Sequence, residues 1–581
     1  MGARAPRTGC EGCHRDGVAG RGTLARALPA DAKGPDVRRE SGSALLAELA
    51  TAHGLLSEGP AGAPVAGQTL RLLLEALGVP ASTDGEVRLS LQTHRSQWRP
   101  LPAVVTARAG RGERVRGCVP EGREASAVVV TAEGHTRSVP VEVRPELART
   151  VGGDRVVPVT VVVPGDLPVG RHLLTLSFTV SGASVPLLVA PQVFPSVPGQ
   201  ARGWGLGGPT GSVTTSSGQV SGDLADLAEL VSWVGADLAG AFVLCPPAGP
   251  VPAPFADPAR LRVGEVPEYA GLLGSGAPAA AAGSESDALR AVYAVPRSPR
   301  RQRAFEAFCV AGGQALLDYA TWLVLGSLHG EEPGSWPEPL RDARSDAVAQ
   351  LREERADDVN FHRWCQWVAD GQQSEAAREA RRVGMAVGLV VPVPAPGAEH
   401  GWHAWSFGSP PLRGVRLGQP PTAAAPEGLV GESSPWSPAS LRDLGYGPLS
   451  SALDVLARHA GGLLLAQPSD WFRRWWVPEG LPASEGAWVE HDHEAVVAAV
   501  GIAAHRHGTA VLADLGALED APARWLLSQG VLPLTRPGTA DGHAGALRWV
   551  DVADLAEGGE LTLGSLAASA SVRRKVRRLG R

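Results

Sequence analysis

The sequence predicts an α/β fold: a (β/α)8 barrel of the TIM type, either complete or short of a strand, preceded by a β-sandwich module. Two observations lead to this fold class. Over residues 86–192, short apolar runs with a period of two are separated by turns rich in Gly, Pro and Asp. Over residues 198–546, short apolar runs alternate with stretches of helical periodicity, which is typical of parallel strands joined by helices.

Composition narrows the class of protein. The 581 residues carry a formal net charge of −6, which argues against nucleic acid as a partner. No uninterrupted apolar run reaches about 18 residues, so we expect no membrane span. The first residues also lack an apolar stretch of signal-peptide length. We therefore expect a cytoplasmic protein without a membrane partner.

Residues 1–43 are expected to form a disordered tail, because they are rich in Gly and Arg and lack periodicity. Within them, Cys10, Cys13 and His14 match the C-x-x-C-H pattern of covalent haem attachment. Haem attachment and an adventitious metal site are alternatives to the tail interpretation, which we prefer. The other four cysteines stand in apolar contexts and are expected to be buried thiols.

Residues 44–197 are expected to hold a helical segment and the sandwich. Apolar residues at helical spacing predict a helix over 43–53, closed by Gly54. Alternating apolar residues predict strands, separated by turns such as 164–170. The predicted strands cover residues 87–91, 127–130, 158–163 and 173–180.

Residues 198–546 are assigned to the barrel and 547–581 to a C-terminal segment. Asp223 is a predicted N-cap for a helix with one apolar face up to Val234. A second helix is expected to end at His459, and a third covers 494–507. The predicted strands between the helices cover residues 241–244, 384–391, 463–465 and 510–512. The active site of such a barrel lies at the carboxyl ends of its strands.

Four aromatic residues and two arginines follow the apolar run Leu463–Leu465: Trp471, Phe472, Arg473, Arg474, Trp475 and Trp476. Aromatic rings stack on sugar faces, so Trp471, Arg473 and Trp436 are candidate glucan-binding residues. Core packing is the alternative, and we prefer it for Trp405, Trp436, Trp475 and Trp476. Trp471 is also a candidate for filling part of a cleft.

Several blocks of sequence resemble the amylomaltases, the 4-α-glucanotransferases of glycoside hydrolase family 77, and the sandwich is similar to that of actinobacterial members. The order and spacing of the blocks agree with this family across about residues 44–535. The matching blocks are residues 203–206, 222–230, 305–309, 361–367, 435–438, 444–446, 458–462, 472–480, 485–486 and 492–495.

The resemblance implies retaining transfer between α-1,4-glucans, with one carboxylate as nucleophile and another as acid/base, about 5–5.5 Å apart. The family's nucleophile motif, Arg-x-Asp-His, corresponds to residues 464–467, so Ala466 stands at the nucleophile position. The family's Gly-Glu-Asp-Leu-Gly corresponds to residues 512–516, so Ala513 stands at the acid/base position. A His-Asp-Leu-Pro motif is missing as well. Polar catalytic blocks are changed while core blocks remain.

Two acidic residues are weak substitutes for the missing pair. Asp514 lies beside the acid/base position, although a cap or turn role is preferred. Asp470 lies four residues past Ala466, and capping the segment that carries Trp471 is preferred over a displaced nucleophile. His403, His491 and His493 form no metal spacing with any cysteine, so neither a metal nor a cofactor is expected.

Three hypotheses remain open. The first is a protein without transferase activity that binds or regulates, with a glucan, a maltooligosaccharide or an active paralogue as partner. The second is a working 4-α-glucanotransferase with relocated carboxylates. The third is the product of a decaying gene with no retained role. Binding without turnover favours the first, product formation the second, and failure to fold the third.

Overall fold

The structure is a computed structural model that describes most of the chain beyond residue 34. The described residues are 35–179, 181–197, 203–208, 213–214, 222–245, 255–274, 285–330, 332–393, 395, 401–423, 425–535, 546–555, 562–569, 572 and 574. The C-x-x-C-H motif of Cys10, Cys13 and His14 lies outside them. The chain divides into the units Met1–Ala44 and Leu45–Arg581, and all of the β-sheets belong to the second unit.

The N-terminal module consists of helices and two β-sheets. Strand β1 pairs in parallel with β9, and all other pairs in the two sheets are antiparallel. Branched apolar side chains from the two sheets form a shared core, which confirms the predicted sandwich. One sheet has the order β1-β9-β8-β3-β4; the other contains β2, β7, β5 and β6. The strands are β1 (Val105–Arg108), β2 (Glu113–Pro120), β3 (Ala125–Val130), β4 (Thr136–Val139), β5 (Val141–Val143), β6 (Arg149–Val151), β7 (Asp154–Val163), β8 (Gly170–Phe178) and β9 (Ser181–Ala190).

The predicted strand over residues 87–91 is wrong, because these residues belong to helix α3 (Asp84–Ser96). Thr83 and Glu86 form a capping box that starts the helix. Val87 and Leu91, one helical turn apart, are buried, whereas Leu89 is 64% exposed. A strand would have placed all three on one face. Helix α1 (Pro35–Ala52) begins at Pro35, and α2 (Gly67–Ala76) follows it.

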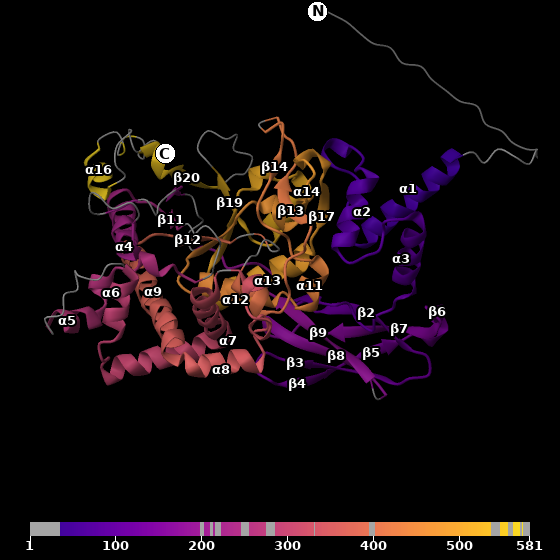
Figure 1. The fold of residues 1–581 in the computed structure, drawn as a ribbon, viewed down its shortest axis with the longest axis horizontal. Helices are drawn as coiled ribbons and strands as arrows, with labels where there is room; N and C mark the ends of the chain where they lie inside the picture. The colour runs from indigo at the N-terminus through magenta and orange to yellow at the C-terminus, as the bar shows by residue number, and fades with distance from the viewer. Residues whose placement is uncertain are drawn as a thin grey trace, which may run out of the picture. The chain divides into compact units, whose positions relative to one another are not determined.

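Seven parallel strands form a closed barrel, and each pairs with the next in chain order until β20 pairs with β10 (Figure 1). This architecture confirms the barrel prediction with one strand fewer than eight among the described residues. β19 pairs directly with β20, so the barrel extends past residue 546. The strands are β10 (Trp204–Gly207), β11 (Phe242–Leu244), β12 (Gly388–Val393), β15 (Gly462–Leu465), β18 (Ala510–Ala513), β19 (Leu532–Thr535) and β20 (Leu547–Asp551).

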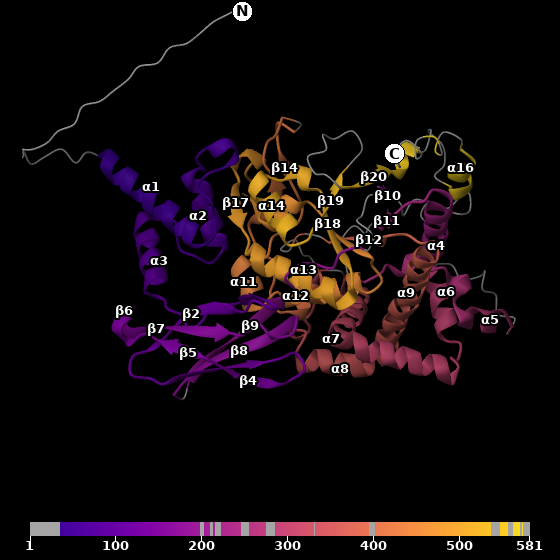
Figure 2. The same ribbon diagram turned by 180° about the vertical axis from the view of Figure 1, so that it is seen from behind.

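Helices cover the outside of the barrel, and the two opposite views show them beside its strands (Figure 1, Figure 2). The predicted cap of α4 is confirmed: the Asp223 carboxylate accepts hydrogen bonds from the backbone N–H groups of Ala225 and Asp226. Apolar side chains from the strands pack together inside the barrel. The larger helices are α4 (Leu224–Ser232), α5 (Pro267–Gly274), α6 (Glu285–Tyr293), α7 (Pro299–His329), α8 (Asp346–Glu354), α9 (Ala356–Arg382), α12 (Gly447–Ala457), α13 (His493–His507) and α14 (Asp520–Ser528).

Helix α7 is, among the described helices, the one long and apolar enough to cross a membrane, and 44% of its most apolar window is buried. Its residues Phe305 and Cys309 pack in the same core as Phe361 and Trp364 of α9. A core helix of a folded domain packs in this way. The length and composition of α7 therefore do not by themselves indicate that it spans a membrane.

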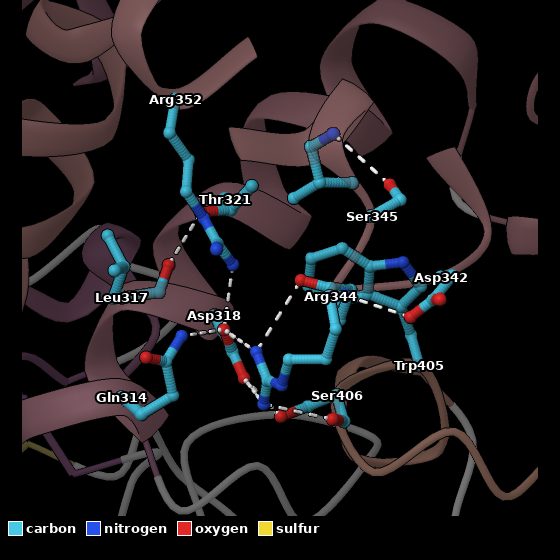
Figure 3. Close-up of polar contacts among 12 residues, drawn as sticks. Gln314, Leu317, Asp318, Thr321, Asp342, Arg344, Ser345, Arg352, Trp405 and Ser406 are labelled. Carbon is cyan, nitrogen blue, oxygen red and sulfur yellow. Dashed lines mark hydrogen bonds and ion pairs between the residues drawn. The ribbon is translucent and has the colours of Figure 1, made fainter. Parts of the chain in front are cut away.

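Asp318 of α7 is fully buried and holds four segments together (Figure 3). Its carboxylate accepts hydrogen bonds from Arg344, from Arg352 of α8 and from Ser406 of the short helix α10 (Trp402–Ser406). Gln314, one turn earlier on α7, donates a further bond at 2.6 Å. A buried carboxylate is tolerated because two cations and two neutral donors surround it.

A third, antiparallel sheet lies between β12 and α13 in the sequence, in the order β14-β13-β16-β17. Trp476 of this sheet is fully buried and packs with residues of α2 and α3, and the indole of Trp475 donates to the carbonyl of Ala483 at 2.8 Å. The core interpretation of these two rings is therefore confirmed. The strands are β13 (Val415–Gln419), β14 (Leu429–Val430), β16 (Arg473–Pro478) and β17 (Ala487–Glu490).

Candidate functional site at the carboxyl ends of β15 and β18

Strands β15 and β18 are neighbours in the barrel, and the residue pairing places Leu465 opposite Ala513. Ala466 follows Leu465 directly, and its N–H donates to the carbonyl of Val393 on β12 at 3.0 Å. The positions that the resemblance assigns to nucleophile and acid/base thus lie side by side at the carboxyl edge of the barrel. Both carry methyl groups, which can neither attack a sugar carbon nor transfer a proton.

Trp471 lies against this edge. It ends the short 3₁₀ helix η10 (Pro468–Trp471), which follows Gln467 in a left-handed conformation with φ 46°. The side chain is fully buried, and its indole Nε1 donates to the carbonyl oxygen of Ala466 at 3.1 Å. The ring therefore packs beside the backbone of the position where the resemblance expects the nucleophile.

Trp436 is also buried, with 1% of its surface exposed. It packs in the same apolar cluster as Trp471 and Leu465. Its indole nitrogen has no hydrogen-bond partner among the described residues. In this structure neither Trp436 nor Trp471 presents a ring face to solvent, so a sugar could reach them only after a rearrangement.

Asp470 does not cap the segment that carries Trp471, and the predicted cap is wrong. The residue before η10 is Gln467, and Asp470 lies inside the turn. Its carboxylate faces the guanidinium of Arg474 at 3.5 Å, and the Asp470 side chain is 24% exposed. Burial raises the pKa of Asp470, and the charge of Arg474 and a hydrogen bond from Ser469 offset part of that rise.

Asp514 caps the turn η12 (Leu515–Ala517), because its carboxylate accepts a hydrogen bond from the N–H of Gly516 at 3.2 Å. This geometry confirms the preferred interpretation of Asp514 as a cap. The turns η10 and η12 are neighbours. No hydrogen bond joins Asp470 to Asp514 within the part of the chain that the structure describes.

Arg473 and Arg474 have opposite environments, because successive residues of a strand point to opposite faces. The Arg473 guanidinium bonds to Glu519 at 2.7 Å and lies over the ring of Trp488, 4.9 Å from its centre. The Arg473 side chain is 39% exposed, so this candidate ligand contact is accessible to solvent. It is already paired with Glu519. Arg474 is only 12% exposed and faces Asp470.

His491 is a member of this region that the sequence pattern did not reveal. It is buried, and the pKa of its imidazole falls to about 3 because of burial first and then the charges of Arg474 and Arg442. Its Nε2 has no hydrogen-bond partner among the described residues. The sequence did contain one signal for this buried polar region: the period of two along β16 turns Arg474 inward, toward His491 and Asp470.

No group of three or more His, Cys, Asp or Glu side chains able to hold a metal occurs among the described residues. Two carboxylates lie near the strand ends of β15 and β18: Asp470 faces an arginine, and Asp514 caps a turn.

Comparisons with known proteins agree on one family. A model described as 4-alpha-glucanotransferase matches residues 279–534, and a model of the MalQ N-terminal beta sandwich domain matches residues 100–191. The 4-alpha-glucanotransferases of Mycobacterium bovis and Mycobacterium tuberculosis are each 32% identical over 511 residues, covering 80% of this chain and 70% of theirs. Amylomaltase from Corynebacterium glutamicum has a similar fold, with a TM-score of 0.75 and 24% identity over 87% of this chain and 78% of that one.

Proposed function

The chain belongs to the 4-alpha-glucanotransferase family, glycoside hydrolase family 77, and from this premise we propose that it has lost transferase activity. In this proposal it acts as a non-catalytic binding or regulatory paralogue in the metabolism of α-1,4-glucans. Its ligand is a maltooligosaccharide or a glucan, and an active paralogue is a second partner. Its place of action is the cytoplasm.

One observation carries the proposal: Ala466 and Ala513, the positions that the resemblance assigns to the two carboxylates of retaining transfer, lie on adjacent strand ends. Without a nucleophile no covalent glycosyl intermediate forms, and without an acid the leaving oxygen is not protonated. The hydrogen bond from Trp471 to the carbonyl of Ala466 adds support, because a buried indole takes space beside the missing nucleophile.

Ligand binding without turnover is the function left to such a barrel. Arg473 is the candidate contact with a solvent-accessible side chain, and its Glu519 partner is 73% exposed and able to move aside. Trp471 and Trp436 remain candidates that need a rearrangement before a ring face reaches a sugar.

A second candidate function, transfer by relocated carboxylates, rests on Asp470. Burial raises the pKa of its carboxyl, which works against the ionised form that a displaced nucleophile needs. The arginine opposite it works in the other direction and favours the ionised form. The partner carboxylate would be Asp514, which is occupied as a cap.

Incubation with maltotriose, followed by chromatography of the products, tests the proposal. We expect no glucose and no longer oligosaccharides at protein concentrations where an active family member exhausts the substrate. Disproportionation would contradict the proposal, and its loss in Asp470→Asn but not in Asp342→Asn would assign the activity to Asp470. Titration with maltoheptaose in a calorimeter then tests binding separately from turnover.

A further inference from the structure

Side chains of helices α7, α9 and α12 line most of a cavity of about 160 Å³. These helices lie outside the barrel strands (Figure 1, Figure 2). The other lining residues are Phe255, Ala256 and Arg458. None of the seven barrel strands contributes a side chain. The cavity is therefore separate from the carboxyl ends of β15 and β18, and a ligand there would leave the former catalytic edge untouched.

The cavity has two chemically different walls. Phe255, Phe308, Leu316 and Val455 form an apolar wall. A polar wall comes from α9, from α12 and from Arg458 directly after α12. It consists of Asp370, Gln373, Ser451, Asp454 and Arg458.

Helix α7 is interrupted next to the apolar lining. Gly313 has φ 51° and ψ −143°, so the helix is broken there. At the neighbouring Gly312 a Cβ atom would meet the side chain of Leu316 at 2.7 Å, so this position has no room for a larger residue. Small side chains, Ala311 and Ala315, complete this part of the lining.

The charges of the polar wall are already balanced. Asp370 accepts hydrogen bonds from Arg458 at 3.0 Å and from His459 at 2.8 Å. Both oxygens of Asp454 accept from Arg506 at 2.7 Å. An ionic ligand would have to break one of these pairs, whereas a neutral ligand would not.

Unused hydrogen-bonding capacity remains on the same wall. The side chains of Gln373 and Ser451 have no hydrogen-bond partner among the residues that the structure describes. A carboxylate offers about four lone-pair sites, so Asp370 keeps acceptor capacity after its two bonds. A cavity lined by amide, hydroxyl and carboxylate groups as well as by apolar side chains suits a molecule that carries both hydroxyls and C–H groups.

We propose that this cavity binds a small neutral polyhydroxylated molecule the size of one sugar ring. Its hydroxyls contact Gln373, Ser451 and Asp370, and its C–H face lies against Phe308 and Leu316. The volume is below the roughly 300–1,000 Å³ of pockets that hold drug-sized ligands, which sets the limit of one ring. The site does not depend on whether the barrel catalyses transfer.

Calorimetric titration of the full chain with D-glucose and with myo-inositol tests the proposal. We expect saturable one-to-one binding of at least one probe, with a Kd on the order of 1 mM. Ala311→Trp, an exposed lining position, fills the cavity and should weaken binding at least about tenfold, or 1.4 kcal/mol. Ala307→Trp, one turn earlier on α7, exposed and outside the lining, should leave the Kd unchanged.

Three results would overturn the proposal. The first is no saturation with either probe up to about 50 mM, which corresponds to negligible affinity. The second is an equal Kd for Ala311→Trp and Ala307→Trp, which would move the site elsewhere, including to the barrel edge. The third is tighter binding of inorganic phosphate than of either probe. Gln373→Leu, at a half-buried position, is a further test that changes the volume less. An unchanged Kd for this variant would show that Gln373 does not contact a ligand hydroxyl.

Discussion

Replacing Asp318 by Asn should strongly destabilise the helical layer outside the barrel (Figure 3). The variant keeps the side-chain shape and removes the charge that Arg344 and Arg352 face at 2.7 Å. Arg352 is only 18% exposed and would be left as a nearly buried cation without a partner. Removing one member of a buried ion pair costs about 3–5 kcal/mol.

The contribution of Arg344 to that loss is small. Its side chain is 51% exposed, so water can replace the lost carboxylate, and exposed pairs contribute about 0–1 kcal/mol. The expected loss in unfolding free energy is therefore about 3–5 kcal/mol, with most of it due to Arg352. Ser406→Ala, which removes one donor to the carboxylate, should cost about 1.5–3 kcal/mol.

Urea denaturation followed by tryptophan fluorescence measures this loss, because Trp336 and Trp405 pack together beside the network. Amide hydrogen exchange in α7, α8 and α10 locates it. Asp342→Asn is the matched control. Among the described residues its exposed carboxylate accepts a hydrogen bond only from the backbone N–H of Arg344, and the change should stay within about 0.5 kcal/mol. A loss for Asp318→Asn as small as for Asp342→Asn would refute the reasoning.

Three further predictions concern other elements. The pKa of His491 is about 3 in the folded protein and about 6.5 in the unfolded protein, so between these pH values the unfolded state binds one more proton. The free energy of unfolding should therefore fall by up to about 2 kcal/mol from pH 7 to pH 5. Urea titrations at the two pH values should show a smaller fall for His491→Gln. Asp223→Ala should cost about 1–2 kcal/mol by removing the N-cap of α4, and Asp223→Ser should restore about half or more of it; equal losses in thermal melts would argue against capping. Trp471→Phe should lower the free energy of unfolding by about 1 kcal/mol, because it removes the hydrogen bond to Ala466. The variant should also catalyse no transfer on maltotriose, and product formation by it would contradict the proposed loss of activity.

Local rules predicted those parts of the fold in which short-range and long-range preferences agree. At α4 the N-cap Asp223 and the apolar spacing indicate the same helix, and the structure contains it. At residues 87–91 the alternating apolar pattern competed with the capping box of Thr83 and Glu86. The observed structure follows the capping box: these residues form a helix that buries Val87 and Leu91 and leaves Leu89 exposed to solvent.

The site was only partly predictable. The resemblance assigned Ala466 and Ala513 to the ends of two barrel strands, and the barrel brings them together because equivalent ends of parallel neighbours meet at one edge. Sequence marked Trp471 as a candidate for filling part of a cleft, but it did not reveal the hydrogen bond to Ala466. It also did not reveal that Asp470 faces Arg474 instead of capping, since both features depend on how η10 packs. The cavity among α7, α9 and α12 is built from residues far apart in the sequence, and nothing in the local pattern separates the break at Gly313 beside it from an ordinary helical glycine.

The most direct test of the central claim is to look for the covalent intermediate itself. Retaining transfer passes through a glycosyl ester on a carboxylate, so intact-mass spectrometry after incubation with α-maltotriosyl fluoride would detect it as added mass. Because the resemblance assigns Ala466 to the nucleophile position, we predict an unchanged mass under conditions where an active family member is labelled. A stoichiometric adduct on a peptide containing Asp470 or Asp514 would contradict the account and identify a relocated nucleophile.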